Sequence, residues 1–598
     1  MSAAPGSALS TAKPERVVRR AVRMGSHLKG QATVAVTLTA IATISKLLIP
    51  LAIRAGVDDG IEKADTTVIA RVSLLGLGLL VIQYIAQRVA YFAVARLGEE
   101  YLANFRGQIF SSLMKLDMPF YGRSKAGVLV ARMTSDIESM TEFVNEGAVM
   151  ALSNALTAFG VAVFLVAVDW RLALPILGVI GILIVISAVF QRWVSRSYAQ
   201  VRERIGGVLA LLQEGITGVR VVQAFTQESG QARAFRRINE RYFEANMGAA
   251  RAISKYFPMV SFLRSLAVGI VLALGGRRVI DGTLSFGTLV AFLLYLNWFF
   301  MPIINLANVY NLGQSAVAAL HKLFAVVDTP VEVAEAPDAR DIMTPVEGRL
   351  ELASVSFGYE PGDLILEDLD LVIPPGQRLA VVGETGAGKS TVAKLLMRFY
   401  DPVKGEVRLD GQDLKRLTHA SRASAVALIP QDDFLFNATL RENIRFGRPS
   451  ADDAAIWAVC ETMGIDGWLR SLPEGLNTEV RERGSRFSSG ERQLVALARA
   501  FLVDPDVIVL DEATSNLDPQ TELAVEQALR RLLSGRTSVV IAHRLRSAER
   551  ADRVIMIDAG AIIADGTHDE LLRTSARYAE LVAVWERGLS SGSPAVEQ

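Results

Sequence analysis

The sequence predicts a chain of two parts: an N-terminal all-α membrane domain of six transmembrane helices, and a C-terminal α/β domain with a phosphate-binding loop. Long apolar runs are confined to residues from about 30 to 310, and the rest reads like a soluble α/β domain. A glycine-rich loop at 383–391 follows an apolar, strand-like run and precedes a helical one. At 598 residues, the chain is also too long for one ordinary hydrophobic core.

Composition excludes several classes of protein. The formal net charge is zero, so bulk electrostatics give no case for a nucleic-acid partner. The chain has one cysteine, Cys460, which excludes an intrachain disulfide framework and a cysteine-cluster metal site. Residues 1–14 are small, polar and proline-containing, and residues 586–598 are similar, so we expect two disordered tails. No cleavable signal peptide is expected.

Six apolar stretches can each cross a membrane. A transmembrane helix needs about 20 mostly apolar residues to span about 30 Å of hydrocarbon. The stretches are roughly 31–53, 69–94, 147–168, 172–191, 257–276 and 286–306. Any one of them alone could be a buried core helix, but six in one segment argue against that reading. We therefore predict a membrane domain over 30–326.

Basic residues predict the orientation of these spans. They gather before the first span and in the two long loops, as Arg16, Arg19, Arg20, Arg23, Lys29, Arg96, Arg106, Lys115, Arg123, Lys125, Arg132, Arg192, Arg196, Arg202, Arg204, Arg233, Arg236 and Arg237. The loop after the first span is acidic instead (Asp58, Asp59, Glu62 and Asp65). The N-terminus, both long loops and the C-terminal domain are thus predicted to be cytosolic, in a plasma (inner) membrane.

The cytosolic segments carry further expectations. Residues 15–29 alternate apolar and basic residues with helical spacing, which fits an amphipathic helix on the inner membrane surface or a plain juxtamembrane charge cluster. The long loops have apolar residues at helical spacing and are predicted to extend the spans, with tips near Phe120–Met133 and Gln213–Phe225. Lys46, Arg88 and Arg264 lie in or near the spans, where they could line a polar substrate cavity or snorkel to water.

The second domain is predicted over 347–585, after a proline-containing linker at 327–346. Its phosphate loop reads Gly383, Glu384, Thr385, Gly386, Ala387, Gly388, Lys389, Ser390 and Thr391. Glycines let backbone N–H groups turn inward around phosphates, and the following helix presents its N-terminus to the anion. Lys389 supplies charge to the terminal phosphates, and Ser390 offers its hydroxyl to Mg²⁺.

An acidic pair follows a second buried strand. The run Ile508–Leu510 is apolar and ends in Asp511 and Glu512. Because side chains alternate along a strand, the two acids can do different work. Asp511 can hold the Mg²⁺ shell while Glu512 polarises an attacking water. A surface acidic pair is the plain alternative, which the upstream phosphate loop disfavours.

With these motifs in place, residues 350–583 resemble the ATP-binding cassette of ABC transporters, and the six spans resemble the type I exporter arrangement. The resemblance covers about 15–583 and implies an α-helical subdomain within the cassette. It assigns adenine stacking to Tyr359, contact with Mg²⁺ and water to Gln431, the γ-phosphate sensor to His543, and a loop between partner domains to Asp518. The signature region Phe487–Gln493 supplies Ser488 and Gly490 to the partner's nucleotide. The loop Thr478–Gly484 resembles the exporter loop that meets the cytosolic helix tips.

The signature departs from the family pattern. The family usually has Leu-Ser-Gly-Gly-Gln, whereas this chain has Phe487-Ser488-Ser489-Gly490-Glu491. Ser489 adds a Cβ, and Glu491 adds a carboxylate near an anion. Both changes could weaken this surface, although helix capping could absorb them. Because the signature acts on the opposite subunit's ATP, the departure suggests a heterodimer.

The resemblance implies a half-transporter: an ABC-type ATPase, with ATP and Mg²⁺ as cofactors, that exports an amphipathic, drug-like or lipid-like substrate. Lys389, Glu512 and His543 are the expected catalytic residues. One chain supplies six spans and one cassette, so a second half-transporter, identical or paralogous, is implied. An ATP-gated channel, a scramblase or a regulatory membrane ATPase is the alternative on the same architecture. A soluble nucleic-acid ATPase is excluded by the six spans, and import is a lesser variant.

Overall fold

The computed structural model describes residues 14–590 apart from 432, 512–518 and 543–544. The chain divides into two compact units. A helical unit contains Met1–Lys115 and Ala126–Thr329, and an α/β unit contains Leu116–Lys125 and Pro330–Gln598. The second unit therefore includes a short segment taken from the middle of the first.

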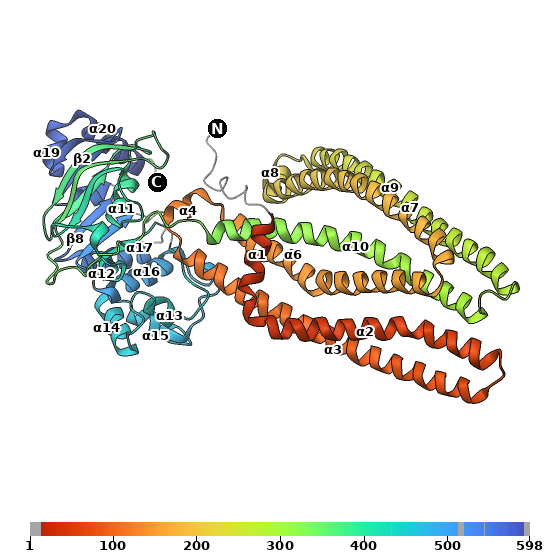
Figure 1. Cartoon of the computed structure of the whole chain (residues 1–598). Helices are drawn as coiled ribbons and strands as arrows, with labels where there is room; N and C mark the ends of the chain where they lie inside the picture. The colour runs from red at the N-terminus through yellow and green to blue at the C-terminus, as the bar shows by residue number, and fades with distance from the viewer. Residues whose placement is uncertain (1–13, 432, 512–518, 543–544, 591–598) are drawn as a thin grey trace. The chain divides into compact units, whose positions relative to one another are not determined.

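Long helices that run side by side make up the helical unit (Figure 1). Its elements are α1 (Pro14–Met24), η2 (Ser26–Leu28), α2 (Lys29–Ala55), η3 (Gly56–Ile61), α3 (Thr66–Lys115), α5 (Ala126–Ala131), η4 (Arg132–Asp136), α6 (Ile137–Glu142), η5 (Phe143–Gly147), α7 (Ala148–Thr217), α8 (Val219–Ala224), α9 (Glu228–Ile280) and α10 (Phe286–Val327). Among the described residues, five helical segments are long and apolar enough to cross a membrane.

Helix α7 accounts for the sixth predicted span. Asp169 has non-helical φ −156° and ψ 97° inside it, so α7 consists of two helices joined at this residue. The Asp169 carboxylate accepts the backbone N–H of Leu172 at 2.9 Å, as an N-cap does for a new helix. Figure 1 shows the chain running out along the first half and back along the second. The predicted helical membrane domain is confirmed, with spans three and four sharing one element.

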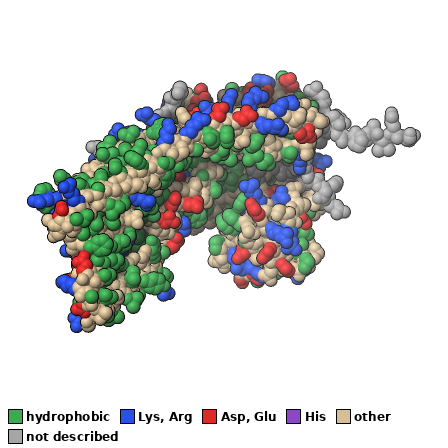
Figure 2. All heavy atoms as spheres, turned by 90° about the vertical axis from the view of Figure 1, so that its right-hand side faces the viewer, with side chains coloured by type: hydrophobic (Ala, Val, Ile, Leu, Met, Phe, Trp, Pro, Cys, Tyr) green, Lys and Arg blue, Asp and Glu red, His purple; other side chains and the backbone are tan. Residues whose placement is uncertain are grey.

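The helical unit carries apolar side chains on its outside. Leu74, Phe92 and Phe159 are 72%, 70% and 70% exposed. Figure 2 shows hydrophobic side chains in broad patches over the surface in view. Contiguous apolar surface of this extent is typical of a surface that contacts another apolar phase. It fits helices that pack against lipid.

The amphipathic N-terminal helix α1 is fixed to the end of α10. Val17 and Ala21 are buried on one face of α1. Arg20 pairs with Asp328 through two contacts of 2.5 and 2.7 Å, and its guanidinium lies 4.3 Å from the ring centroid of Phe324. The Asp328 carboxylate raises the pKa of Arg20 further above its ordinary value. The basic residue is therefore used in tertiary packing as well as in surface charge.

Two sheets build the α/β unit. In the described residues, a six-stranded sheet has the order β10-β9-β3-β8-β7-β6, and a four-stranded antiparallel sheet has the order β2-β1-β4-β5. The strands are β1 (Leu350–Phe357), β2 (Leu366–Ile373), β3 (Arg378–Val382), β4 (Lys404–Leu409), β5 (Gln412–Asp413), β6 (Val426–Ile429), β7 (Val507–Asp511), β8 (Thr537–Ile541), β9 (Arg553–Asp558) and β10 (Ala561–Gly566). All neighbours in the larger sheet are parallel except β10 and β9.

Helices complete this unit. They are α4 (Met118–Arg123), α11 (Lys389–Leu396), η6 (Leu414–Arg416), α12 (His419–Ala425), α13 (Leu440–Arg445), α14 (Asp453–Met463), α15 (Asp466–Ser471), η7 (Gly475–Asn477), η8 (Glu482–Gly484), α16 (Ser489–Val503), α17 (Pro519–Leu533), α18 (Leu545–Glu549), α19 (His568–Thr574) and α20 (Ala576–Ser590). A second hydrophobic core packs the helices from α13 through α17 against β6, β7 and β8, and it buries Ile456, Cys460 and Leu497. This is the expected helical subdomain within the α/β fold.

The segment 116–125 packs as part of the α/β unit. Asp117 caps α4 by accepting the N–H of Phe120 at 3.4 Å, and its other oxygen accepts the N–H of Val333 at 2.8 Å. Arg123 forms a salt bridge of 2.6 Å with Glu332, and the Tyr400 hydroxyl donates to the carbonyl of Met118 at 3.4 Å. Side chains from three separate stretches of sequence thus hold this one turn of helix.

Candidate functional site

The phosphate loop connects β3 to α11 and has the backbone that its glycines permit. Gly383, Gly386 and Gly388 have φ values of 150°, 88° and 105°, which L-residues with a Cβ rarely adopt. A Cβ on Gly383 would collide with the carbonyl oxygen of Ile557, and one on Gly388 would lie 2.8 Å from the Leu366 side chain. The loop therefore requires glycine at these positions, and its backbone amides can face a phosphate.

Lys389 lies at the centre of this loop. Its side chain is 5% exposed, and the ammonium donates to the carbonyl oxygens of Gly383 and Glu384, each at 2.8 Å. Burial lowers the pKa of Lys389 below its ordinary value, while the negative charge of Asp511 opposes that shift. The loop thus holds a cation against its own backbone, where a polyphosphate can take over the hydrogen bonds.

The sheet order brings the acidic strand end to the same edge. Val381, Ile541 and Asp511 are paired across β3, β8 and β7, so Asp511 lies level with the residues just before the phosphate loop. Gln431 follows the neighbouring strand β6 at the same edge and is exposed. The hydroxyl of Ser390 and the carboxylate of Asp511 are hard oxygen donors of the kind that Mg²⁺ prefers. Three predicted residues, Glu512, Asp518 and His543, lie outside the described residues.

Tyr359 follows β1 and lies against the helix that begins at the phosphate loop. Its hydroxyl is 3.3 Å from the Thr391 hydroxyl, and it accepts a hydrogen bond of 3.1 Å from the Lys394 ammonium. The ring packs edge-on against Tyr400 and Phe357, with centroid distances of 5.2 and 5.1 Å. The aromatic side chain is thereby held beside the loop, where a nucleotide base could stack on it.

The signature residues form the N-terminus of α16. Ser488 is the N-cap, and its hydroxyl accepts the N–H of Glu491 at 3.3 Å. The Glu491 carboxylate in turn accepts the N–H of Ser488 at 2.8 Å, which completes a capping box. Its other oxygen accepts the indole N–H of Trp468 at 2.9 Å. Gly490 is buried while Ser488 is exposed, so the serine hydroxyl is presented outward.

Two contacts of this region were missed by the sequence analysis. Trp468 lies on α15 and Arg577 on α20, both far from the motifs in sequence. Arg577 forms a salt bridge of 2.8 Å with Asp558 and lies 3.5 Å from the Glu384 carboxylate of the phosphate loop. A sequence pattern gives no signal for either residue, because tertiary packing alone brings them to the site.

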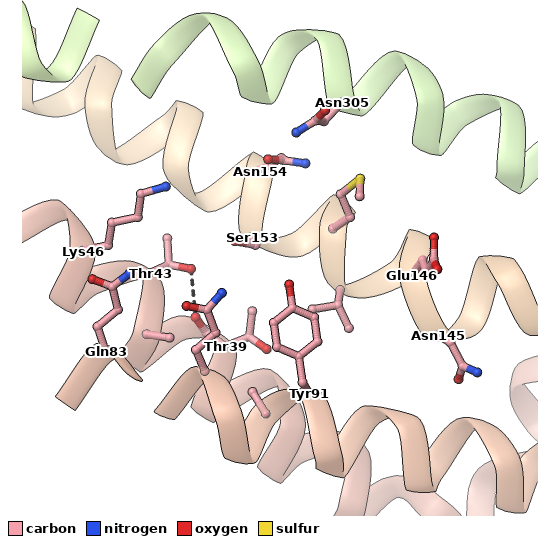
Figure 3. Close-up of a pocket in the computed structure, with 15 residues that line it drawn as sticks. Thr39, Thr43, Lys46, Gln83, Tyr91, Asn145, Glu146, Ser153, Asn154 and Asn305 are labelled. Carbon is pink, nitrogen blue, oxygen red and sulfur yellow. Dashed lines mark hydrogen bonds between the residues drawn. The ribbon is translucent and has the colours of Figure 1, made fainter. Parts of the chain in front are cut away.

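A polar cavity lies inside the helical unit (Figure 3). Its volume is about 590 Å³, and its lining comes from α2, α3, η5, α7 and α10. The polar lining residues are Thr39, Thr43, Lys46, Gln83, Gln87, Tyr91, Asn145, Glu146, Ser153, Asn154 and Asn305. Of the three cations singled out in the spans, Lys46 lines this cavity, whereas Arg88 and Arg264 do not. The signal that could have found the cavity is the helical spacing of Thr39, Thr43 and Lys46 in an apolar run.

Comparisons with known proteins give one family for both units. Residues 33–303 match the ABC transporter transmembrane region, and residues 366–515 match the ABC transporter family. The chain is 34% identical to a multidrug efflux ATP-binding/permease protein of Mycobacterium tuberculosis, covering 94% of this chain and 47% of that one. It is 32% identical to a fatty acid ABC transporter ATP-binding/permease protein of the same species, covering 87% and 82%. A bacterial Atm1-family ABC exporter solved with ATP bound is 26% identical, with a TM-score of 0.78 over 95% of this chain and 99% of that one.

Proposed function

Because the chain belongs to the ABC transporter family, we propose that it pairs with a second half-transporter to form a primary active exporter of amphipathic, drug-like or lipid-like compounds. The chain is an exporter half-transporter of the multidrug, lipid and fatty acid type, and its ATPase domain couples ATP hydrolysis to transport. The observation that supports this proposal is a single chain with membrane-crossing helices, an internal polar cavity and a phosphate loop of the required backbone geometry.

ATP binding is assigned to the phosphate loop and its neighbours. The amides of 383–391 and the Lys389 ammonium hold the phosphates, and Tyr359 stacks on the adenine. Ser390, Asp511 and Gln431 would hold Mg²⁺, which supplies positive charge to the phosphate oxygens during transfer. The oxygen ligands on β7, β6 and the loop lie at one edge of the same sheet, as this assignment requires.

Hydrolysis is assigned to Glu512 and His543, which follow β7 and β8, together with Lys389 at the start of α11. Glu512 orients and deprotonates the attacking water, and His543 and Lys389 stabilise the charge on the transferring phosphoryl group. The Glu512→Gln variant is expected to bind ATP normally and to turn over about 10²–10⁴-fold more slowly, because the general base is lost while the binding groups remain. Single-turnover hydrolysis and nucleotide binding measure the two effects separately. Near-normal turnover would contradict the assignment.

The second half-transporter completes each ATP site. Ser488 and Gly490 are assigned to the γ-phosphate bound by the partner, and Asp518 to the contact between the two cassettes. The altered signature at Phe487–Glu491 leaves two partners, a second copy or a paralogue. Purification of this chain expressed alone distinguishes them, because an ATPase-active homodimer excludes an obligate heterodimer and an inactive monomer supports one.

Transport is assigned to the plasma (inner) membrane with the cassette in the cytosol, as the basic loops predict. The cargo would leave the cytosol or the inner leaflet. Inverted membrane vesicles that carry the protein in their bilayer should accumulate a fluorescent amphipathic dye when ATP is added. Vesicles that carry the Glu512→Gln variant should not. Equilibration without accumulation would instead favour a channel or scramblase.

A further inference from the structure

The polar cavity of the helical unit carries an uneven distribution of charge. Its lining has one basic residue, Lys46 on α2, and one acidic residue, Glu146 on η5. Figure 3 shows the two at opposite ends of the cavity, with amide side chains between them. A ligand that spans the cavity therefore meets positive charge at one end and negative charge at the other.

Lys46 lacks a counter-ion within the described part of the chain. None of the described carboxylates lies within ion-pair distance of its ammonium, which instead lies 5.1 Å from the ring centroid of Trp298. The residue is half-buried in an apolar helix that is long enough to cross a membrane. A charge in such a segment is costly unless a partner or water accompanies it. A bound anion would provide that partner.

Hydrogen-bond donors face the same end of the cavity. The side-chain nitrogen of Asn154 is buried and has no partner in the described structure. Figure 3 shows Lys46, Asn154 and Asn305 around the same open space. The hydroxyls of Thr39 and Thr43 already donate to the carbonyls of Ala35 and Thr39, each at 2.8 Å. The ammonium, the amides and the hydroxyls of Tyr91 and Ser153 therefore line the cavity as donors, which suits a head group that accepts hydrogen bonds.

The remaining lining sets the size and character of the ligand. Ala42, Ala90, Val149 and Met150 give the cavity apolar wall beside its polar groups. A volume of about 590 Å³ is in the range of small-molecule sites. Glu146 disfavours a second negative charge at the far end. The lining thus favours a single negative charge near Lys46, and it offers an apolar remainder the wall at Val149 and Met150.

We propose that this cavity binds an amphipathic organic anion with a single carboxylate or phosphate head, with Lys46 as its counter-ion and Asn154 as a hydrogen-bond donor. This inference rests on the proposed export function and names its substrate class. The apolar part of the ligand lies along Val149 and Met150, and Lys46 distinguishes the anion from a cation of the same length.

The test is binding to the full chain in phosphatidylcholine nanodiscs, with four probes that each have a ten-carbon chain: decanoate, decyl phosphate, decyltrimethylammonium and decyl maltoside. Decanoate or decyl phosphate should bind at least tenfold more tightly than the cation and the sugar, and the tighter of the two identifies the head group. Equal affinity for all four, preference for the cation, or binding of none would overturn the proposal.

Variants separate a charge effect from a packing effect. Lys46→Met should weaken anion binding about tenfold or more and leave decyl maltoside unchanged, whereas Lys46→Arg should retain anion preference. Arg88 lies on the neighbouring helix α3 and does not line this cavity. The Arg88→Met variant should therefore bind the anion probes with wild-type affinity. Unchanged anion affinity in Lys46→Met would contradict the proposal. If that variant fails to fold, Asn154→Leu provides the second test and should weaken the anion probes alone.

ATP binding by the same nanodiscs distinguishes this inference from the proposed function. If the wild-type chain binds and hydrolyses ATP but shows no anion preference, the proposed substrate class is contradicted and the proposed export function stands. If the chain does not bind ATP, both the proposed export function and the substrate class that rests on it are contradicted.

Discussion

Glu491 shows how a residue that departs from a family pattern is accommodated by its neighbours. The concern from sequence was a carboxylate close to the partner's phosphate. In the structure one oxygen caps α16 and the other accepts the Trp468 indole N–H, so both oxygens are engaged. A negative charge at a helix N-terminus is also favourable with respect to the helix dipole. The capping box could be predicted from the Ser-x-x-Glu spacing, whereas Trp468 could not.

Substitution of Glu491 should therefore separate geometry from charge. Glu491→Gln keeps an acceptor for Ser488 and Trp468 and should leave the melting temperature nearly unchanged. Glu491→Ala removes the box and should lower stability by about 1 kcal/mol. Thermal melting with ATP-binding measurements checks both variants. Trp468→Phe is the matched control for the indole contact, and an unchanged Glu491→Ala protein would contradict this account.

Cys460 gives a pH-dependent prediction because it is buried in the helical subdomain. Burial raises the pKa of its thiol to about 12, mainly because the thiolate would lose its hydration. In the unfolded chain the thiol ionises near its ordinary value of about 8.5. The folded state binds the proton more tightly, so the contribution is full below about pH 8.5 and is lost as pH rises toward 12.

Two measurements check this prediction. A maleimide or a disulfide reagent should label the native chain very slowly at pH 8 and rapidly after denaturation, since the thiolate is the reactive form. The unfolding midpoint should fall as pH rises above about 8.5, and Cys460→Ala should show a smaller slope over that range. Rapid labelling of the native chain would contradict the burial of the thiol.

At the level of elements, the sequence predicts where the helical spans lie better than it predicts which residues of different helices come together. Apolar run length was sufficient to place six spans, because it depends only on local composition. The spans predicted at 147–168 and 172–191 leave only three residues between them, and the capping contact of Asp169 with Leu172 explains how the second helix begins within so short a turn. The spacing of Thr39, Thr43 and Lys46 points to a polar face on α2, but the full lining of the cavity could not be predicted, since it requires polar residues from five elements to meet.

Helix α4 depends on one carboxylate for two contacts. Asp117 caps the helix and also accepts the N–H of Val333, which lies far away in sequence. Asp117→Ala removes both acceptors and should cost about 1–2 kcal/mol in the attachment of this segment. Limited proteolysis within 116–125 should become faster, while the cassette should still bind ATP.

The control for this change is Asp117→Asn, which keeps an oxygen acceptor and should be cleaved at close to the wild-type rate. Arg123→Ala removes only the exposed salt bridge with Glu332 and should change the cleavage rate only slightly. Equal cleavage of Asp117→Ala and wild type would show that Asp117 does not hold the segment.

At the level of the whole molecule, the order of the strands in the larger sheet, rather than any single motif, brings the residues of the ATP site together. Motif spacing gave the identity of the phosphate loop and Asp511, but their proximity depends on β8 lying between β3 and β7. That order is a tertiary property, and a pattern read along the chain does not contain it. The roles of Glu512, Asp518 and His543 remain predictions from sequence, because these residues lie outside the described ones.

The segment 116–125 also bears on how the protein is made. It belongs to the α/β unit, yet the chain emerges from the ribosome in order, so this segment is synthesised well before Glu332, Val333 and Tyr400. Apart from the local cap of Asp117 on Phe120, its contacts have no partners until most of the helical unit has been translated. Final docking of α4 must therefore be a late, post-insertion step in biogenesis, and a ribosome stalled before residue 330 would hold a chain whose first long loop is still unanchored.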